Sequence, residues 1–313
     1  MQITPASLSV FFTACDTRFW TAYGTARVFY EDIASVILSG TEQNTYGWIG
    51  KLATMRQWVG ERQLKNPGAL SYTLVNLPYE LTETIDKYKL LDDTYGVYAP
   101  IIERMGQAAR KLPDYQLVEM LQSNSGAGPI CVDKLNYFAG NHPVNPYDST
   151  LSTYSNYDSS SFPLTNLNYQ AARAQMMAYK GEDGKPLGLM PQTLIVPPQL
   201  EYIAKTIVGS SFIGVPQIGG QTGLVGTTEN VLKDTAKVIV IPELAADATT
   251  WYLADCSLPI KPFLWQRRSP TEFVYRINPQ DPHVFMLHEY IYGVEERGAP
   301  GVSMPWMCSK HVG

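Results

Sequence analysis

The spacing of apolar and polar positions changes along the chain. The first change, after residue 44, divides a predicted arm from a predicted hairpin. Residues 1–44 contain an amphipathic stretch from Leu8 to Ile37, which predicts a short helix plus an extended arm. The following segment begins rich in glycine and aromatic side chains, and continues with stretches at 58–64 and 71–76 on either side of a turn. These stretches predict the two strands of a β-hairpin, and residues 79–85 predict a further strand.

The turn of this hairpin is predicted at Asn66-Pro67-Gly68. Proline followed by glycine at the centre of a turn favours type II, because glycine adopts the positive φ that this turn requires. Charged side chains flank the turn at Glu61, Arg62 and Lys65. We therefore expect a hairpin whose tip carries charge.

The longest helical pattern covers residues 93–124. Apolar positions recur there at three- and four-residue spacing, so they share one face of a helix. Asp92 or Asp93 can cap its start. Pro113 is expected to kink or break the helix, and Asp114 could then cap a second piece.

Beyond residue 124 the pattern becomes irregular, then α/β in kind, and finally β-rich. The irregular part contains a polar Ser/Tyr-rich loop at 147–161, and a loop of that length usually has a contact role. Helices are predicted at 164–180 and 199–208, and strands at 193–196, 238–241, 263–267, 273–277 and 284–294.

Composition favours a chain that partners cover. Of the 313 residues only 17% are charged, while 20 are Tyr and 6 are Trp. Low charge with many amphipathic aromatic side chains suits a protein that buries its outer surface, although a tyrosine-rich monomer has the same composition. The net charge is −5, and the densest basic run is Arg267–Arg268, so sequence-specific binding of DNA is not expected.

The two ends and the cysteines indicate a protein of a reducing compartment. The first residues lack a charged segment followed by an apolar one, so no signal peptide is predicted, and no apolar run is long enough for a membrane span. Cys15, Cys131, Cys256 and Cys308 lie far apart, without the spacing of a disulfide framework. The default is therefore the cytoplasm.

Candidate catalytic and metal-binding residues form no coherent constellation. His283 and His288 are five residues apart, whereas a helical zinc pair needs four, and a strand would place them on opposite faces. Cys308 and His311 have ligand-like spacing but no second pair nearby, and they lie at a terminus, where disorder is common. The glycine-rich segment 219–226 lacks the Gly-Lys-Ser/Thr ending of a phosphate loop. We expect no enzyme, no metal and no cofactor.

Several segments resemble, in the same order, the major head subunit family of Mu-like phages. They are Asn44–Lys51, Met55–Arg62, Asp92–Ile102, Phe138–Pro143, Pro191–Leu200, Lys261–Arg267 and His283–Gly293. The collinear resemblance runs from about residue 44 to about residue 300, which is far more specific than any single motif. Residues 304–313 resemble the family's aromatic ending only loosely.

The resemblance implies an α+β fold, the tailed-phage major capsid fold of the Hong Kong ninety-seven type. Its parts would be an N-terminal arm at 1–44, an extended hairpin loop region at 45–85, a peripheral domain with a spine helix at 86–164, an axial α/β domain at 165–258, and returning peripheral strands at 259–313.

The function that the resemblance implies is structural. The chain would self-assemble as hexamers and pentamers into an icosahedral phage head around double-stranded DNA, without sequence specificity. Further partners would be scaffold and portal proteins during assembly, and decoration proteins. No membrane is involved, and the chain would be found in the virion, and in the host cytoplasm during assembly.

Two alternatives stay open at this point. One is an encapsulin-like compartment shell of the same fold, which would package enzymes and not DNA. The other is a soluble hydrolase that uses Cys131, with His142 as a partner, or the histidine cluster. Substitution of these residues would separate a hydrolase from a shell protein.

The hairpin is the candidate assembly element, with Trp58, the charged flanks and the turn as contacts. An isolated two-stranded hairpin is marginally stable in water, so we expect it to project from the subunit and to become ordered on a neighbour. Its charged side chains would then set the register of the contact. The alternative is an internal hairpin that buries Trp58 and Leu64 in its own subunit.

Overall fold

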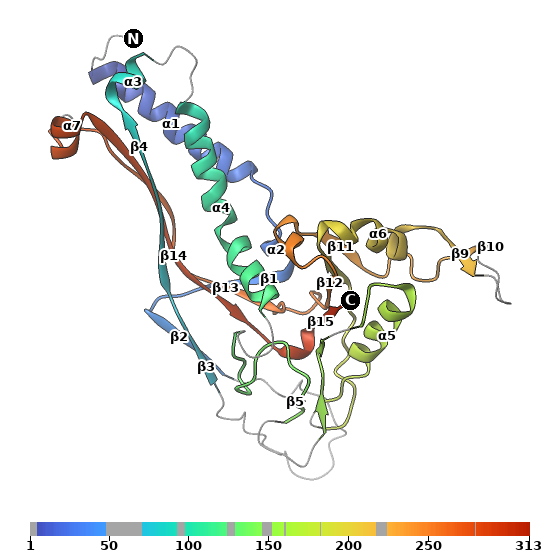
Figure 1. Ribbon diagram of the computed structural model, residues 1–313. Helices are drawn as coiled ribbons and strands as arrows, with labels where there is room; N and C mark the ends of the chain where they lie inside the picture. The colour runs from blue at the N-terminus through green and yellow to red at the C-terminus, as the bar shows by residue number, and fades with distance from the viewer. Residues whose placement is uncertain are drawn as a thin grey trace.

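The computed structural model describes residues 5–47, 71–92, 98–123, 129–145, 152–159, 161–181, 183–216, 224–278 and 280–313. Strands within these ranges form a four-stranded sheet, a five-stranded sheet and three two-stranded pairs. The four-stranded sheet and two long helices extend away from the five-stranded sheet, which gives the molecule an elongated outline (Figure 1).

The four-stranded sheet is built on one long antiparallel hairpin. Its strand order is β1 (Ala34–Leu38), β13 (Phe263–Arg276), β14 (Glu289–Val302) and β4 (Leu77–Asp86). β1 is parallel to β13, and β4 is antiparallel to β14. The connection between β13 and β14 contains the short helix α7 (Pro282–Leu287), at the far end of the elongated part (Figure 1).

The helix α1 (Pro5–Thr25) packs along α4 (Tyr98–Gln122), and α4 contacts β14. Their close approach depends on Gly106, because a Cβ there would lie 2.5 Å from the carbonyl oxygen of Phe19. The prediction of a short helix with an extended arm is wrong for residues 5–25, which form one long helix. α1 has 21 residues, because apolar side chains at helical spacing bury against the body: Phe12, Cys15, Phe19 and Ala22.

Of the predicted kink or break at Pro113, the break does not occur, since α4 continues through this buried proline. Asp114 does not cap a second helical piece. Its carboxylate instead accepts hydrogen bonds from the backbone N–H groups of Phe29, at 3.2 Å, and Tyr30, at 2.8 Å, at the start of α2 (Tyr30–Ile33). Burial raises the pKa of Asp114 to about 6, and these hydrogen bonds oppose the rise.

The five-stranded sheet contains parallel and antiparallel pairs, and it lies mainly in the part of the chain where the sequence predicted alternating helices and strands. Its order is β11 (Lys237–Val240), β8 (Thr193–Val196), β12 (Thr250–Ala254), β15 (Cys308–Val312) and β7 (Tyr157–Asp158). One face packs against α5 (Asn166–Met177) and α6 (Glu201–Gly209). The other face packs against the C-terminal half of α4, so this helix joins the two sheets.

The remaining elements are shorter. They are β2 (Gln43–Gly47), β3 (Ser71–Val75), α3 (Lys87–Leu91), β5 (His142–Pro143), β6 (Thr153–Tyr154), η1 (Pro198–Leu200), β9 (Phe212–Pro216), β10 (Leu224–Glu229), η2 (Pro242–Ala246) and η3 (Pro305–Met307). The predicted Ser/Tyr loop therefore contains β6 and β7, and β7 pairs with β15.

The C-terminal third departs from the prediction in two places. The predicted strand at 284–294 is helical in its first part, where Pro282 begins α7 and His288, at φ 55°, ends it. The expected disorder at the terminus is wrong, since β15 lies between β12 and β7 with buried side chains. Residues 259–313 are thus divided between the two sheets.

Candidate functional site: the root of the hairpin

The predicted assembly contacts lie outside the described residues. These are Trp58, Glu61, Arg62, Lys65, Asn66, Pro67 and Gly68. The structure instead describes where their segment leaves the body: β2 pairs antiparallel with β3, and Gly47 lies opposite Ser71. The predicted strand at 71–76 is confirmed, and its partner among the described residues is β2. β2 was not predicted as a strand, and the predicted strand at 58–64 lies outside the described residues.

Side chains with neutral polar groups hold the base of this pair on the four-stranded sheet. We call them the root network, and its members are Ser39, Thr41, Asn44, Tyr46, Asn76 and Gln266. Gln266, on β13, is fully buried, and Asn76, directly after β3, is 2% exposed. Buried amides are costly unless they are hydrogen-bonded, so their partners identify the contacts that matter.

Gln266 is the centre of the root network. Its Oε1 accepts from the Tyr46 hydroxyl at 2.6 Å, and its Nε2 donates to Asn76 Oδ1 at 2.7 Å. Asn76 Nδ2 donates in turn to Ser39 Oγ at 3.0 Å and to the carbonyl oxygen of Thr41 at 2.9 Å. The network thereby ties β2 and the end of β3 to β1 and β13.

Aromatic and apolar side chains of β2 and β3 also attach the pair to the body of the subunit. The Tyr72 hydroxyl donates to the carbonyl oxygen of Val302, and the rings of Tyr46 and Tyr72 lie 5.6 Å apart. A Cβ at Gly301 would lie 2.3 Å from Cδ1 of Leu74, so this leucine packs directly on β14. Burial raises the pKa of both tyrosines, so both hydroxyls remain protonated donors at neutral pH.

A second fixed point lies at the end of α4. Lys310 of β15 is buried, and its ammonium donates to the carbonyl oxygens of Leu121 and Ser123, each at 3.0 Å. These carbonyls belong to the last turn of the helix, which has no intrahelical donors for them. Lys310 therefore caps α4 from a strand 187 residues away in sequence, and no local sequence pattern indicates such a partner.

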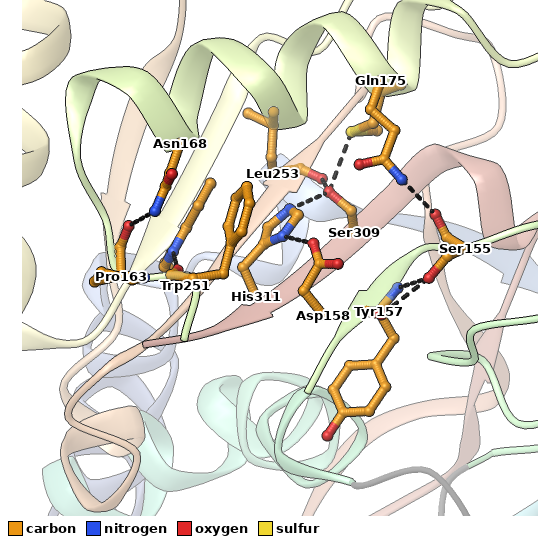
Figure 2. A network of polar contacts seen from close by, with 12 residues as sticks. Ser155, Tyr157, Asp158, Pro163, Asn168, Gln175, Trp251, Leu253, Ser309 and His311 are labelled. Atoms are coloured by element: carbon orange, nitrogen blue, oxygen red, sulfur yellow. Dashed lines mark hydrogen bonds and ion pairs between the residues drawn. The ribbon is translucent and has the colours of Figure 1, made fainter. Parts of the chain in front are cut away.

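A Ser–His–Asp series links β15 to β7 (Figure 2). His311 Nε2 lies 2.9 Å from Ser309 Oγ, and His311 Nδ1 lies 2.6 Å from Asp158 Oδ2. Ser309 is 2% exposed and also contacts the sulfur of Met176, so no substrate can reach its hydroxyl. Burial lowers the pKa of His311, and the hydrogen bond to Asp158 opposes this. The series is a buried link between strands.

Both ring nitrogens of His142, the proposed partner of the Cys131 nucleophile, contact other groups. His142 Nδ1 lies 2.6 Å from Asp133 Oδ2, and its Nε2 lies 3.1 Å from the carbonyl oxygen of Tyr137. Burial raises the pKa of Cys131 well above its ordinary value, so the thiol is not activated. These contacts give no support to the hydrolase alternative.

The other candidates are also separate. His283 contacts the carbonyl oxygen of Arg276, and His288 lies against the ring of Tyr88. Within the described ranges, no three His, Cys, Asp or Glu side chains converge in a way that could hold a metal ion. The helices of the same ranges include none with the length and apolar character to cross a membrane.

Comparison with known proteins decides the family. The family model described as Mu-like prophage major head subunit gpT matches residues 8–163, 156–244 and 243–311. The chain belongs to this family. The head subunit is 28% identical over 301 residues to the major capsid protein of Escherichia phage Mu, covering 96% of this chain and 72% of the relative. It is 23% identical over 311 residues to the Mu-like prophage FluMu major head subunit of Haemophilus influenzae, covering 99% and 74%.

Solved structures agree with this family. A chain of the procapsid of bacteriophage JBD30 matches the head subunit with a TM-score of 0.61 and 26% identity, covering 99% of this chain and 76% of that chain. A virus-like particle from Pyrococcus furiosus matches with a TM-score of 0.53 at 11% identity, covering 96% and 99%, which shows the fold alone. The predicted tailed-phage capsid fold and major capsid function are confirmed, and the compartment alternative is not favoured.

Proposed function

We propose that the head subunit assembles as hexamers and pentamers into a closed icosahedral head that encloses double-stranded DNA. Scaffold and portal proteins take part during assembly in the host cytoplasm. Decoration proteins bind the head; a related structure is described as the JBD30 capsid decorated with minor capsid protein trimers. No step of this function needs catalysis or a cofactor.

The observation that carries the proposal is the hairpin root. β2 and β3 form a two-stranded pair outside both large sheets, and every second residue along each strand is exposed. Two strands alone are marginally stable in water, and the body of the subunit packs on only one side of this pair, which leaves the other side for a further surface. We propose that the surface belongs to a neighbouring subunit, which the hairpin contacts through Trp58, Glu61, Arg62, Lys65 and the turn at 66–68.

The two sheets support the proposed division of the subunit. The four-stranded sheet with α1 and α4 would form the peripheral part, and residues 165–258 the axial part. β7 and β15 join the axial sheet from outside that range. Heterologous contacts of one such subunit close around rotation axes, and many weak contacts together make a shell stable.

The test is a deletion of residues 62–71, bridged by a short Gly-Ser linker. We expect a folded, soluble subunit that fails to form closed shells, because the deletion removes the contact and leaves both sheets. Circular dichroism and thermal unfolding report the fold, and negative-stain imaging reports the particles. A matched control replaces Glu61, Arg62 and Lys65 together with Ser, which keeps the hairpin and should alter register more than shell yield.

Two results would contradict the proposal. If the deletion unfolds the subunit, the hairpin is part of the core. If closed shells form at normal yield, the hairpin is not an assembly element.

A further inference from the structure

The buried amides of the root network cost more to bury than apolar side chains of the same size would. Gln266 is fully buried and Asn76 nearly so, in a region where Leu74 and Tyr72 already provide apolar packing. Apolar contacts are non-directional, whereas hydrogen bonds have strict distance and angle requirements. A fully bonded polar network therefore defines one orientation of the strand pair relative to the sheet.

The hydrogen bonds of the root network join both strands of the pair to the four-stranded sheet, as a fixed orientation requires. Gln266 belongs to β13, Tyr46 to β2, and Asn76 directly follows β3, so one amide fixes both strands of the pair at once. The backbone contributes in the same place, since Asn76 N–H donates to the carbonyl oxygen of Glu42 at 3.0 Å and Ser39 N–H donates to that of Arg267 at 2.9 Å. Rotation of the strand pair about its base would break several of these bonds together.

We infer that Gln266, with Tyr46 and Asn76, is a positioning clamp that sets the direction in which the hairpin leaves the subunit, and so selects closed shells over other assemblies. The inference rests on the proposed contact between the hairpin and a neighbour. A subunit with a loosened clamp keeps its fold and its hairpin but presents the hairpin over a range of angles. Its contacts then close less often, giving sheets, tubes or open fragments.

The test variant combines Gln266→Met with Tyr46→Phe. Methionine has nearly the shape of glutamine, and removing the tyrosine hydroxyl avoids leaving it without an acceptor. The matched control is Tyr252→Phe, which removes a hydroxyl that donates to the carbonyl oxygen of Leu121 at 2.8 Å, away from the root. If the double variant fails to fold, Tyr46→Phe alone carries the test, since its ring is half-buried and keeps its packing.

Orientation is measured separately from assembly. Spin labels at Ser71→Cys, at the end of β3, and at Thr84→Cys, on β4, occupy exposed positions, in a chain whose half-buried Cys256 is replaced by Ser. We expect the distance distribution to broaden in the clamp variant and the yield of closed shells to fall severalfold. The Tyr252→Phe control should leave both unchanged, although it removes a more deeply buried hydrogen bond.

The outcomes separate this inference from the proposed function. An unchanged distance distribution, or a broadened one with a normal yield of closed shells, would overturn the clamp. If the deletion of residues 62–71 also gives normal shells, the hairpin contact itself fails. If that deletion abolishes shells while the clamp variant assembles normally, only the clamp is wrong.

Discussion

The five-stranded sheet and the β2–β3 pair differ in how far their own subunit buries them. Every residue of β8 and β12 is buried, and helices or other segments of the same chain cover both faces of their sheet. Residues of β2 and β3 alternate between exposed and half-buried, and the half-buried ones, which include Tyr46, Tyr72 and Leu74, contact the body. The five-stranded sheet is covered by its own chain alone. The β2–β3 pair has an exposed side that its own chain does not cover.

The polar groups of the two regions differ in the same way. The five-stranded sheet encloses ionisable side chains, with Lys310 on the end of α4 and His311 beside Asp158. The root network consists of amides and hydroxyls that remain neutral across the physiological range. The comparison predicts that substitutions in the sheet change the stability of the subunit, and that substitutions in the pair change assembly.

The largest effect is expected from Trp251→Ala on β12. Trp251 is fully buried and its Nε1–H donates to the carbonyl oxygen of Phe162 at 2.9 Å. Removing a buried indole costs about 3–5 kcal/mol, which is a large part of the stability of a typical domain. Urea unfolding of the unassembled subunit measures the loss. A loss below about 1 kcal/mol would show that this sheet is not the stable core.

Lys310→Ala should cost less, about 1–3 kcal/mol, because it removes the buried donor of the Ser123 carbonyl, while the Leu121 carbonyl keeps its hydrogen bond from Tyr252. Lys237→Ala is the matched control, since its ion pair with Asp32 is exposed and contributes at most about 1 kcal/mol. Thermal unfolding of both variants decides the comparison. Equal midpoints would mean that the cap on α4 contributes no stability.

The pH dependence of stability should separate the body from the root. Asp114 holds its proton more tightly in the folded state, with a pKa of about 6 against an ordinary 3.8. Its contribution is therefore fully present below about pH 4 and is lost as the pH rises through about 6. The loss is at most about 3 kcal/mol, because one pKa unit corresponds to about 1.4 kcal/mol.

Asp114→Asn keeps an acceptor for the N–H groups of α2 and removes the titration. The unfolding free energy of the native chain should fall relative to that of the variant between pH 4 and about 6, and then stay level. The difference in unfolding free energy between the native chain and Tyr46→Phe should not change between about pH 5 and 8, because no root residue titrates there. A flat Asp114→Asn difference would contradict the assignment.

The smallest effect is expected on the exposed face of the strand pair. The hydroxyls of Thr45 and Thr73 lie 3.1 Å apart in a cross-strand contact. Thr73→Ala should change the unfolding free energy by only about 0.2–1 kcal/mol. Chemical denaturation of the free subunit tests this. A loss comparable to that of Trp251→Ala would show that β3 is core structure. It would contradict the proposed difference between the β2–β3 pair and the five-stranded sheet.

Elements with strong local patterns could be predicted from the sequence. The strand at 193–196 has the predicted bounds, and the helix predicted at 164–180 is α5, capped by Thr165. Local signals failed where a distant partner decides the outcome. Pro113 stays helical within a buried face of α4, and α1 packs closely on α4 because Gly106 has no side chain.

The candidate site could be predicted only in outline. The sequence predicted a hairpin with strands at 58–64 and 71–76. The second of these is β3, but its partner β2, at Gln43–Gly47, was not predicted as a strand. Gln266 could not be found this way, because it lies 220 residues from Tyr46 in sequence and a buried glutamine has no distinguishing pattern. The C-terminal strand was missed for the same reason, since its sheet partner β12 comes from a distant segment.

The most direct test of the account is an electron-microscopy reconstruction of particles assembled from the purified head subunit, with scaffold added if needed. The account predicts closed shells of hexamers and pentamers in which residues 48–70 of each subunit lie on a neighbour and Gln266 contacts Tyr46 and Asn76. A subunit that stays monomeric at high concentration with scaffold present, or a shell in which residues 48–70 pack only on their own subunit, would contradict it.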